Sequence, residues 1–257
     1  MTKGLRWIFA LLVLVSSSAS GKQVLEHIVA STHAVVPNVR LSFRLGDGTV
    51  HIYGSDEPAL KVTAIKKAYT QERLDAIQVN VTVNGDEAAI ETVVPPKAPG
   101  LSTADRSGTV DYTVLVPQTC TITRLEVENG EIIVEGIRGE GLSASLTNGR
   151  MRAVNCFTPT DLVLRSGGLE IAYFWWEQRS FSVSAQTRQG DMRVALPKDS
   201  AARFDAATEN GWIRNQFDPE RELDGKAQAY EWILGIDPTS EIKLRAQSGN
   251  VRIENIY

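Results

Sequence analysis

Side chains that could bind a metal ion or transfer a proton are sparse and scattered in this sequence. Its histidines are His27, His33 and His51, and the first two precede the region of regular apolar–polar alternation. His51 falls on an outward, polar position of its own alternating segment. Because a metal site needs ligands that converge on one point, we predict neither a metal site nor a bound cofactor.

Carboxylates grouped on one sheet face would be needed for polysaccharide cleavage. Just after the turn glycines described below, the acidic residues Asp86, Glu131 and Asp191 are interspersed with neutral and basic ones, such as Arg150. The sequence also lacks G-x-S-x-G, H-E-x-x-H, C-x-x-C and glycine-rich phosphate-loop motifs. We therefore predict a protein without catalytic residues, and the alternative is a polysaccharide lyase or hydrolase built on a β-helix.

Two cysteines could form a disulfide if the chain is exported to an oxidising compartment. Cys120 and Cys156 lie two repeat units apart, at different offsets from the preceding glycine. Two stacked coils are separated by about 9.6 Å, whereas the Cα atoms of a disulfide lie within about 7 Å. We expect two buried thiols and no disulfide between them.

The aromatic stretch YFWWEQRSF, residues 173–181, is the most unusual local feature. In a strand, adjacent side chains point to opposite faces, so about half of these rings can enter a core. Trp175 and Trp176 fall where the strand should end, beside charged residues. Exposed rings of this kind suit sugar stacking or a protein contact. We predict Tyr173, Trp175 and Trp176 as ligand-binding residues, and the alternative is a ring that folds back over a neighbouring coil.

These residues belong to a repeat that is marked by a glycine after a small polar residue. Most intervals between successive marks are close to 20 residues, and the first and last are close to twice that length. A sustained period of this length indicates a stacked array. The marks are Asp47-Gly48, Asn84-Gly85, Ser107-Gly108, Asn129-Gly130, Asn148-Gly149, Ser166-Gly167, Gln189-Gly190, Asn210-Gly211 and Ser248-Gly249.

Apolar residues alternate with polar ones on both sides of the marks, as in Leu142, Ala144 and Leu146 before one glycine and Met151 and Ala153 after it. Alternation with period two predicts strands with one buried face. An isolated hairpin buries too little apolar surface to be stable, whereas stacked units cover one another. We predict an all-β, single-domain β-solenoid with coils of about 20 residues, and the alternative is a β-sandwich or barrel of repeated hairpins.

Residues 1–20 have the composition of a secretory signal peptide. Lys3 and Arg6 precede an apolar run at 7–15, and small residues follow at 16–20. The apolar run is short for a membrane span, which needs about 20 residues. We predict an exported protein that is periplasmic, secreted or on the cell surface, and the alternative is that the segment is retained as an anchor.

The rest of the chain is expected to form an N-terminal arm at 21–34 and one β-strand-repeat domain at 35–257. Two irregular segments interrupt the repeat, and we predict loops at 95–108 and 217–240. The only polar stretch of helical composition is TQERLDAI at 70–77, which is long enough for at most two turns.

The segment DYTVLVPQTCTITRLEVENGEIIVEGIRGEGLSASLTNGRMRAV, from Asp111 onward, resembles a bacterial family of exported β-strand-repeat proteins. The matching features are a strand that ends in Val116-Pro117 and the strand–Asn-Gly–strand units that follow it. The resemblance extends over residues 35–256. The family's domain is usually labelled an adhesin, although its function is unknown. The resemblance implies a β-helix-like fold and an envelope or surface location, and it implies no catalytic residues.

Charge and composition favour a role in contact with other surface molecules. The formal net charge is −4, and acidic and basic residues are interleaved. The absence of a basic stripe argues against nucleic acid as a partner. We expect an adhesin-like module that binds an envelope glycan or a surface protein. Because the sequence ends in VRIENIY, one residue after a predicted strand, we also consider a scaffold that self-associates end to end or edge to edge through an exposed sheet edge.

Overall fold

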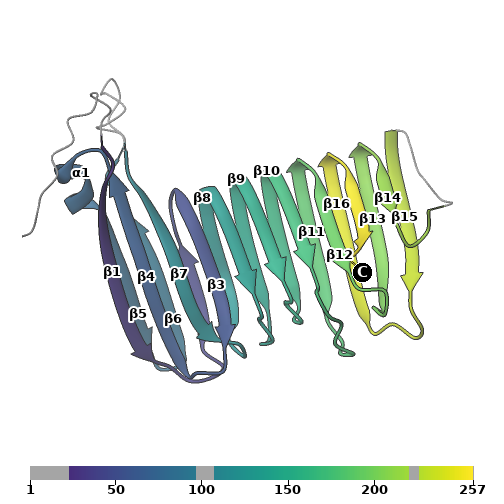
Figure 1. The fold of residues 1–257 in the computed structure, drawn as a ribbon, viewed down its shortest axis with the longest axis horizontal. Helices are drawn as coiled ribbons and strands as arrows, with labels where there is room; N and C mark the ends of the chain where they lie inside the picture. Colours follow the sequence, from purple (N-terminus) through teal and green to yellow (C-terminus); the bar gives the residue numbers. More distant parts are fainter. Residues whose placement is uncertain (1–22, 97–106, 220–225, 257) are drawn as a thin grey trace, which may run out of the picture.

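The computed structural model describes residues 23–96, 107–219 and 226–256, so the predicted signal peptide lies outside the described residues. The described residues form strands and one short helix, stacked into an elongated solenoid (Figure 1). The strands are β1 (Leu25–Ala34), β2 (Arg40–Arg44), β3 (Gly48–Ser55), β4 (Ala59–Ala68), β5 (Gln78–Asn84), β6 (Glu87–Val93), β7 (Thr109–Pro117), β8 (Thr121–Glu135), β9 (Leu142–Val154), β10 (Thr160–Ala172), β11 (Ser182–Gln189), β12 (Met192–Leu196), β13 (Ala202–Asn210), β14 (Ile213–Asn215), β15 (Lys226–Leu234), β16 (Ser240–Ser248) and β17 (Val251–Asn255). The helix is α1 (Gln71–Ala76).

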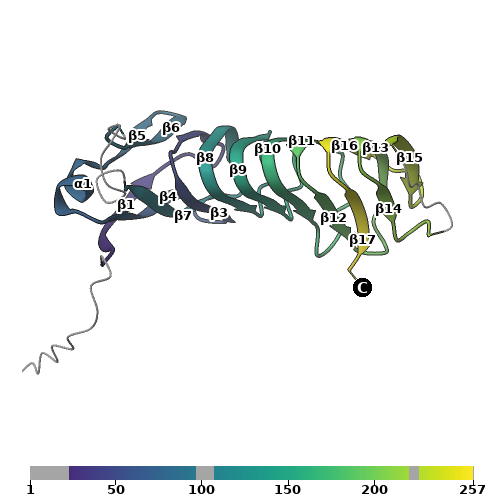
Figure 2. The ribbon, with the colours of Figure 1, turned by 90° about the horizontal axis from the view of Figure 1, so that it is seen from above.

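Each coil consists of one strand before the turn glycine and one strand after it. In β8, β9 and β10 a single long strand bends at the glycine, whereas β11 and β12 are separate strands on either side of Gly190. The strands before the glycines form one layer, which we call the front sheet, and those after them form the back sheet (Figure 2). Parallel pairing of like strands from coil to coil confirms the predicted β-solenoid.

Hydrophobic residues fill the space between the two sheets. In β9, Leu142, Ala144 and Leu146 are buried in the front half, and Met151 and Ala153 are buried in the back half. The residues between them in sequence are partly or fully exposed. The predicted alternation is therefore confirmed, and burial of each large apolar side chain stabilises the stack by about 1.5–3 kcal/mol.

The coil corners at the glycines require a residue without a Cβ atom. Gly130, Gly149 and Gly167 have φ angles of 141°, 137° and 136°. A Cβ atom added to Gly149 would lie 1.8 Å from the carbonyl oxygen of Gly130 in the neighbouring coil. The residues before these glycines also stack: Asn148 donates a hydrogen bond to Asn129 at 2.9 Å, and Asn129 donates to Asp47 at 2.6 Å.

The coils do not stack in sequence order. The first coil, β2 and β3, lies between β6/β7 and β8, and the last coil, β16 and β17, lies between β11/β12 and β13/β14. The sequence had suggested an exposed strand edge at 251–255. That expectation is wrong, because β17 is paired on both sides and the last residues lie within the array (Figure 1).

Antiparallel strands complete the two ends of the solenoid. At one end β5 pairs with β6, and β4 pairs with β7 and β1. Residues 25–34, predicted as part of a separate arm, therefore form an edge strand of the back sheet, in register with β4 over its whole length. At the other end β15 pairs with β13, so residues 226–234 are a strand within the segment predicted as the 217–240 loop.

Two local features at the β1 end also refine the sequence interpretation. Asn84-Gly85 is the tight turn of the β5–β6 hairpin and not a coil corner, since Gly85 has φ +62° and open space around it. Helix α1 begins after Thr70, whose hydroxyl accepts a hydrogen bond from the Arg73 amide, so the expected helical stretch is confirmed. Most of the predicted 95–108 loop lies outside the described residues.

Candidate functional site at the aromatic corner

The stretch 173–181 forms the corner that joins the end of β10 in the back sheet to the start of β11 in the front sheet. The corresponding corner of the preceding coil, between β9 and β10, spans only residues 155–159. The additional residues bring the aromatic side chains together. We call Phe157 and the side chains of residues 173–181 the aromatic corner.

Half of the aromatic corner belongs to the hydrophobic core. Tyr173 is only 1% exposed, and its hydroxyl donates a hydrogen bond to the Cys156 carbonyl oxygen at 3.1 Å. Its ring packs against Phe157 and Phe181, with ring centroids 5.0 and 5.6 Å away. Burial raises the pKa of Tyr173 well above its usual value. Tyr173, one of the three predicted ligand-binding residues, therefore supports the corner from inside and does not reach its surface.

Trp175 and Phe174 form the exposed half of the aromatic corner. The exposed fractions are 47% for Trp175 and 42% for Phe174. Trp176 lies between the two halves: it is partly buried and packs against Phe181 and Tyr173, with ring centroids 5.5 Å apart in both cases. Of the three predicted residues, Trp175 is thus the most exposed, with Trp176 behind it.

A strained asparagine fixes the backbone at Phe174. Asn155 is buried and has φ +50°, a left-handed conformation that non-glycine residues seldom adopt. Its side-chain oxygen accepts a hydrogen bond from the Phe174 amide at 2.8 Å. This bond connects two consecutive coils, so the position of the Phe174 backbone is determined by the stack and not by the corner alone.

A carboxylate holds the Trp175 ring in place. Glu177 accepts a 3.1 Å hydrogen bond from the Trp175 indole nitrogen and a 2.6 Å charge-assisted bond from Arg138. Arg138 in turn lies over the Phe157 ring, 5.6 Å from its centroid. Burial alone would raise the pKa of Glu177, but the hydrogen bonds from Arg138 and Trp175, with the positive charges of Arg138 and Arg179, lower that pKa below its usual value.

The sequence contains signals that distinguish the two halves of the aromatic corner. Leu169, Ile171 and Tyr173 follow Gly167 at two-residue intervals, so the alternation of β10 already places Tyr173 in the core. The same alternation sends Phe174 outward, and Phe174 was not among the predicted residues. No local pattern indicates Arg138 or Asn155, because they come from other coils.

The side chains of the aromatic corner are suited to noncovalent contact with another molecule. It offers two exposed rings beside a satisfied Arg138–Glu177 pair, and its one buried phenol has a raised pKa. Over the described ranges, no group of three or more histidine, cysteine or acidic residues is placed to hold a metal ion. Cys156, directly before Phe157, is a buried free thiol whose pKa is raised by burial to about 11, and Cys120 is also buried and free.

A comparison with known protein families identifies the family to which the chain belongs. The family model described as Toastrack DUF4097 matches residues 40–254, from the start of β2 into β17. The chain belongs to the Toastrack DUF4097 family. This membership confirms the resemblance to an exported-repeat family that the sequence indicated. The edge strand β1 precedes the residues matched by the Toastrack model.

Solved structures match most of the length of this Toastrack chain. A "putative cell adhesion protein" from Clostridium sporogenes is 15% identical, with a TM-score of 0.53, and the match covers 91% of this chain and 100% of that one. A "putative adhesin" from Bacteroides fragilis is 8% identical, with a TM-score of 0.30 and coverages of 89% and 97%. A "putative lipid binding protein" from Parabacteroides distasonis is 9% identical, with a TM-score of 0.30 and coverages of 88% and 97%. No curated protein matches the chain.

No helix within the described part of the chain is long and apolar enough to cross a membrane.

Proposed function

We propose that this protein is an exported, non-catalytic contact module of the cell envelope or surface, and that it binds a glycan or protein partner through the aromatic corner. The observation that carries the proposal is the pair of exposed rings, Phe174 and Trp175, at a corner fixed by Asn155 and Glu177. Residues 1–20 contain basic residues, then an apolar run, then small residues, and this order supports export. The Clostridium sporogenes neighbour, which is named a "putative cell adhesion protein", supports a contact role.

Rigidity is what makes two exposed rings useful for binding. An aromatic ring held in one position loses little conformational entropy when a partner covers it. Flat rings can stack on the apolar faces of sugars or enter an apolar pocket of a protein. Because binding by one corner would be weak, we expect several copies on a surface to act together.

The test is retention of the purified chain from Gly21 onward on cell-envelope fractions and a panel of neutral polysaccharides. The variant Phe174→Ala/Trp175→Ala removes the exposed rings and leaves Tyr173 and Trp176 in place. Trp212→Ala is the matched control, because Trp212 is partly exposed near the Gly211 corner, where Arg214 and Arg252 lie over its ring.

We expect the wild type and Trp212→Ala to be retained and the double variant to be released at least tenfold more readily. Equal retention of the double variant would show that the aromatic corner is not the contact site. If the wild type is not retained on any envelope fraction or glycan, the contact role itself is wrong.

A second candidate function, self-association, is favoured by strand β1. This ten-residue strand pairs with β4 on one side, and no pairing of its other side occurs within the described residues. Its Ile28 side chain is 64% exposed. A free strand edge can pair with another copy of the chain. Molar mass measured across a range of concentrations would rise for the wild type and stay monomeric for Ile28→Lys if this edge mediates assembly, and a constant monomer mass for the wild type would exclude it.

A further inference from the structure

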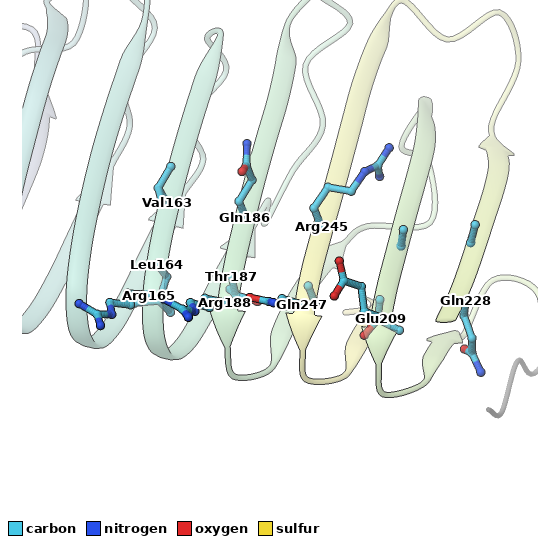
Figure 3. Close-up of a pocket in the computed structure, with 14 residues that line it drawn as sticks. Val163, Leu164, Arg165, Gln186, Thr187, Arg188, Glu209, Gln228, Arg245 and Gln247 are labelled. Atoms are coloured by element: carbon cyan, nitrogen blue, oxygen red, sulfur yellow. The ribbon is translucent and has the colours of Figure 1, made fainter. Parts of the chain in front are cut away.

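A groove crosses the outer face of the front sheet near its β15 end (Figure 3). It has a volume of about 720 Å³ and extends from β10 across β11, β16 and β13 to β15. The glycine corners border it, so it lies along the opposite edge of the coils from the aromatic corner. Its lining includes Val163, Arg165, Gln186, Arg188, Glu209 and Gln247.

The floor of the groove combines small apolar groups with amides. Val163 is exposed on β10, and Ala207 and Ala229 occupy neighbouring positions on β13 and β15. Gln186 on β11 lies in the same row, and Gln247 on β16 lies in the next row toward the glycine corners (Figure 3). Amide groups both donate and accept hydrogen bonds, so this floor suits a ligand that is rich in hydroxyl groups.

Two arginines lie side by side at one end of the groove. Arg165 on β10 and Arg188 on β11 directly follow Leu164 and Thr187, which are register partners, and Figure 3 shows Arg165, Arg188, Gln247 and Glu209 in one row across successive strands. Neighbouring strands are separated by about 4.8 Å. The two guanidinium groups are therefore close enough to bind one anionic group or two successive ones.

These two arginines lack an acidic partner in the described part of the chain, unlike several other arginines of the two sheets. Within the described residues, neither Arg165 nor Arg188 has an ion pair or a side-chain hydrogen bond. In contrast, Arg245 in the same groove binds Asp205, and Arg193 on the back sheet binds both Glu170 and Glu254. Adjacent like charges repel one another, and an anion bound between them would remove this repulsion.

We propose that the groove binds an anionic polysaccharide, with Arg165 and Arg188 binding its carboxylate or sulfate groups and the glutamine amides binding its hydroxyls. Arginine presents paired N–H groups that match the two oxygens of a carboxylate. This second site has a different ligand chemistry from that of the aromatic corner and is independent of it.

The same face offers space for a ligand longer than the groove. A second shallow groove of about 390 Å³ shares strands β10 and β11 with the first and is lined by hydroxyl groups that include those of Thr123, Ser143 and Ser184. A linear polysaccharide could follow both grooves across the coils. A nucleic acid fits less well, because its closely spaced phosphates need a row of basic contacts, whereas Arg165 and Arg188 are followed across the groove by Gln247 and Glu209 (Figure 3).

The test is affinity electrophoresis of the chain from Gly21 onward in native gels that contain polygalacturonate, dextran sulfate, neutral dextran or no polymer. The variant is Arg165→Gln/Arg188→Gln. The control variant is Lys198→Gln/Arg203→Gln, which removes the same charge from two exposed residues outside the groove. Phe174→Ala/Trp175→Ala is run in parallel to separate this site from the aromatic corner, and duplex DNA is the competing polyanion.

We expect polygalacturonate to retard the wild type, the Lys198/Arg203 control and the aromatic variant equally, and the Arg165/Arg188 variant to bind about tenfold more weakly. Retardation by neutral dextran should be absent, and the effect should weaken as salt is added. Retardation by dextran sulfate that depends on Arg165 and Arg188 would show that sulfate as well as carboxylate is accepted. The proposal is overturned if neither anionic polymer retards the wild type, if both charge variants weaken equally, or if DNA competes as well as the polysaccharide.

Discussion

Glu177 contributes both to the stability of the aromatic corner and to the orientation of its exposed Trp175 ring. It is the common acceptor for Arg138, whose side chain covers Phe157, and for Trp175, which faces solvent. A carboxylate in this position holds an exposed tryptophan in one orientation without burying it. We therefore expect changes at Glu177 to affect both stability and ligand contact.

Glu177→Gln should lower the free energy of unfolding at pH 7 by about 1 kcal/mol, because it removes a partly buried ion pair. The pKa of Glu177 is lower in the folded protein than the usual 4.5, so its stabilising effect is complete above about pH 4.5 and is lost as the pH falls through the lowered pKa. The difference between wild type and variant should therefore shrink between pH 6 and pH 3 in urea titrations.

Glu128→Gln serves as the control for this prediction, because Glu128 is exposed on β8 and has no ion pair among the described residues. A difference between wild type and Glu177→Gln that stays constant down to pH 3 would contradict the assigned role of the carboxylate.

A single added methyl group should distinguish the coil-corner glycines from ordinary glycines. Gly149→Ala places a Cβ atom 1.8 Å from the Gly130 oxygen and also requires φ near +137° from an L-residue. We expect it to lower the free energy of unfolding by about 3 kcal/mol or more. Gly168→Ala, where nothing lies within 4 Å of the added atom, should change it by about 0.5 kcal/mol or less. Equal values in urea unfolding would contradict the stacked-glycine corner.

At the level of single residues, alternation and turn chemistry predict much of what the structure has. They identify the buried positions of β9 and the corner glycines, and they place aromatic rings at 173–181. They do not predict Arg138 or Asn155 as neighbours of that stretch, because contacts between coils depend on the stacking register, which the local pattern does not contain.

Among the elements, strand β17 differs most from expectation, because it lies inside the array and not at its end. Its two neighbours, β12 and β14, come from different parts of the chain, and β17 joins them in the back sheet. Ile253 on β17 is fully buried. The last strand of the sequence is therefore an interior strand of the array.

Ile253→Asp tests this placement, because burial of an unpaired carboxylate should lower the free energy of unfolding by about 3 kcal/mol or more. Arg252→Ala, one residue away on the outer face, should lower it by about 0.5 kcal/mol. Both are measured by urea unfolding. A small effect of Ile253→Asp would mean that β17 frays at an open end.

The sequence analysis does not predict the Asn84-Gly85 hairpin turn, strand β15 or the order of the coils, and the physical reason differs in each case. Asn-Gly is suited to tight hairpins as well as to coil corners, so Asn84-Gly85 is counted as a coil although it joins β5 and β6. Strand β15 lies outside the counted marks, yet Tyr230, Trp232 and Leu234 alternate inward and indicate a strand. The order of the coils cannot be read from the sequence, because every coil presents a similar pattern to its neighbours.

On the scale of the whole molecule, the two sheets give the protein two distinct long edges. The glycine corners lie along one edge and the longer corners, including the aromatic corner, along the other (Figure 1). Charged side chains connect neighbouring coils across the back sheet, as in the chain of ion pairs from Arg152 through Glu170 and Arg193 to Glu254. The surface that a partner meets is therefore fixed by the stack as a whole.

The most direct measurement of the contact role is hydroxyl-radical footprinting of the chain from Gly21 onward, with and without a cell-envelope fraction that retains it. We predict that the envelope fraction protects Phe174 and Trp175 from oxidation and leaves Trp212 unchanged. Unchanged oxidation of Phe174 and Trp175 while the protein is retained would show that the partner binds elsewhere and would contradict the assignment of the aromatic corner.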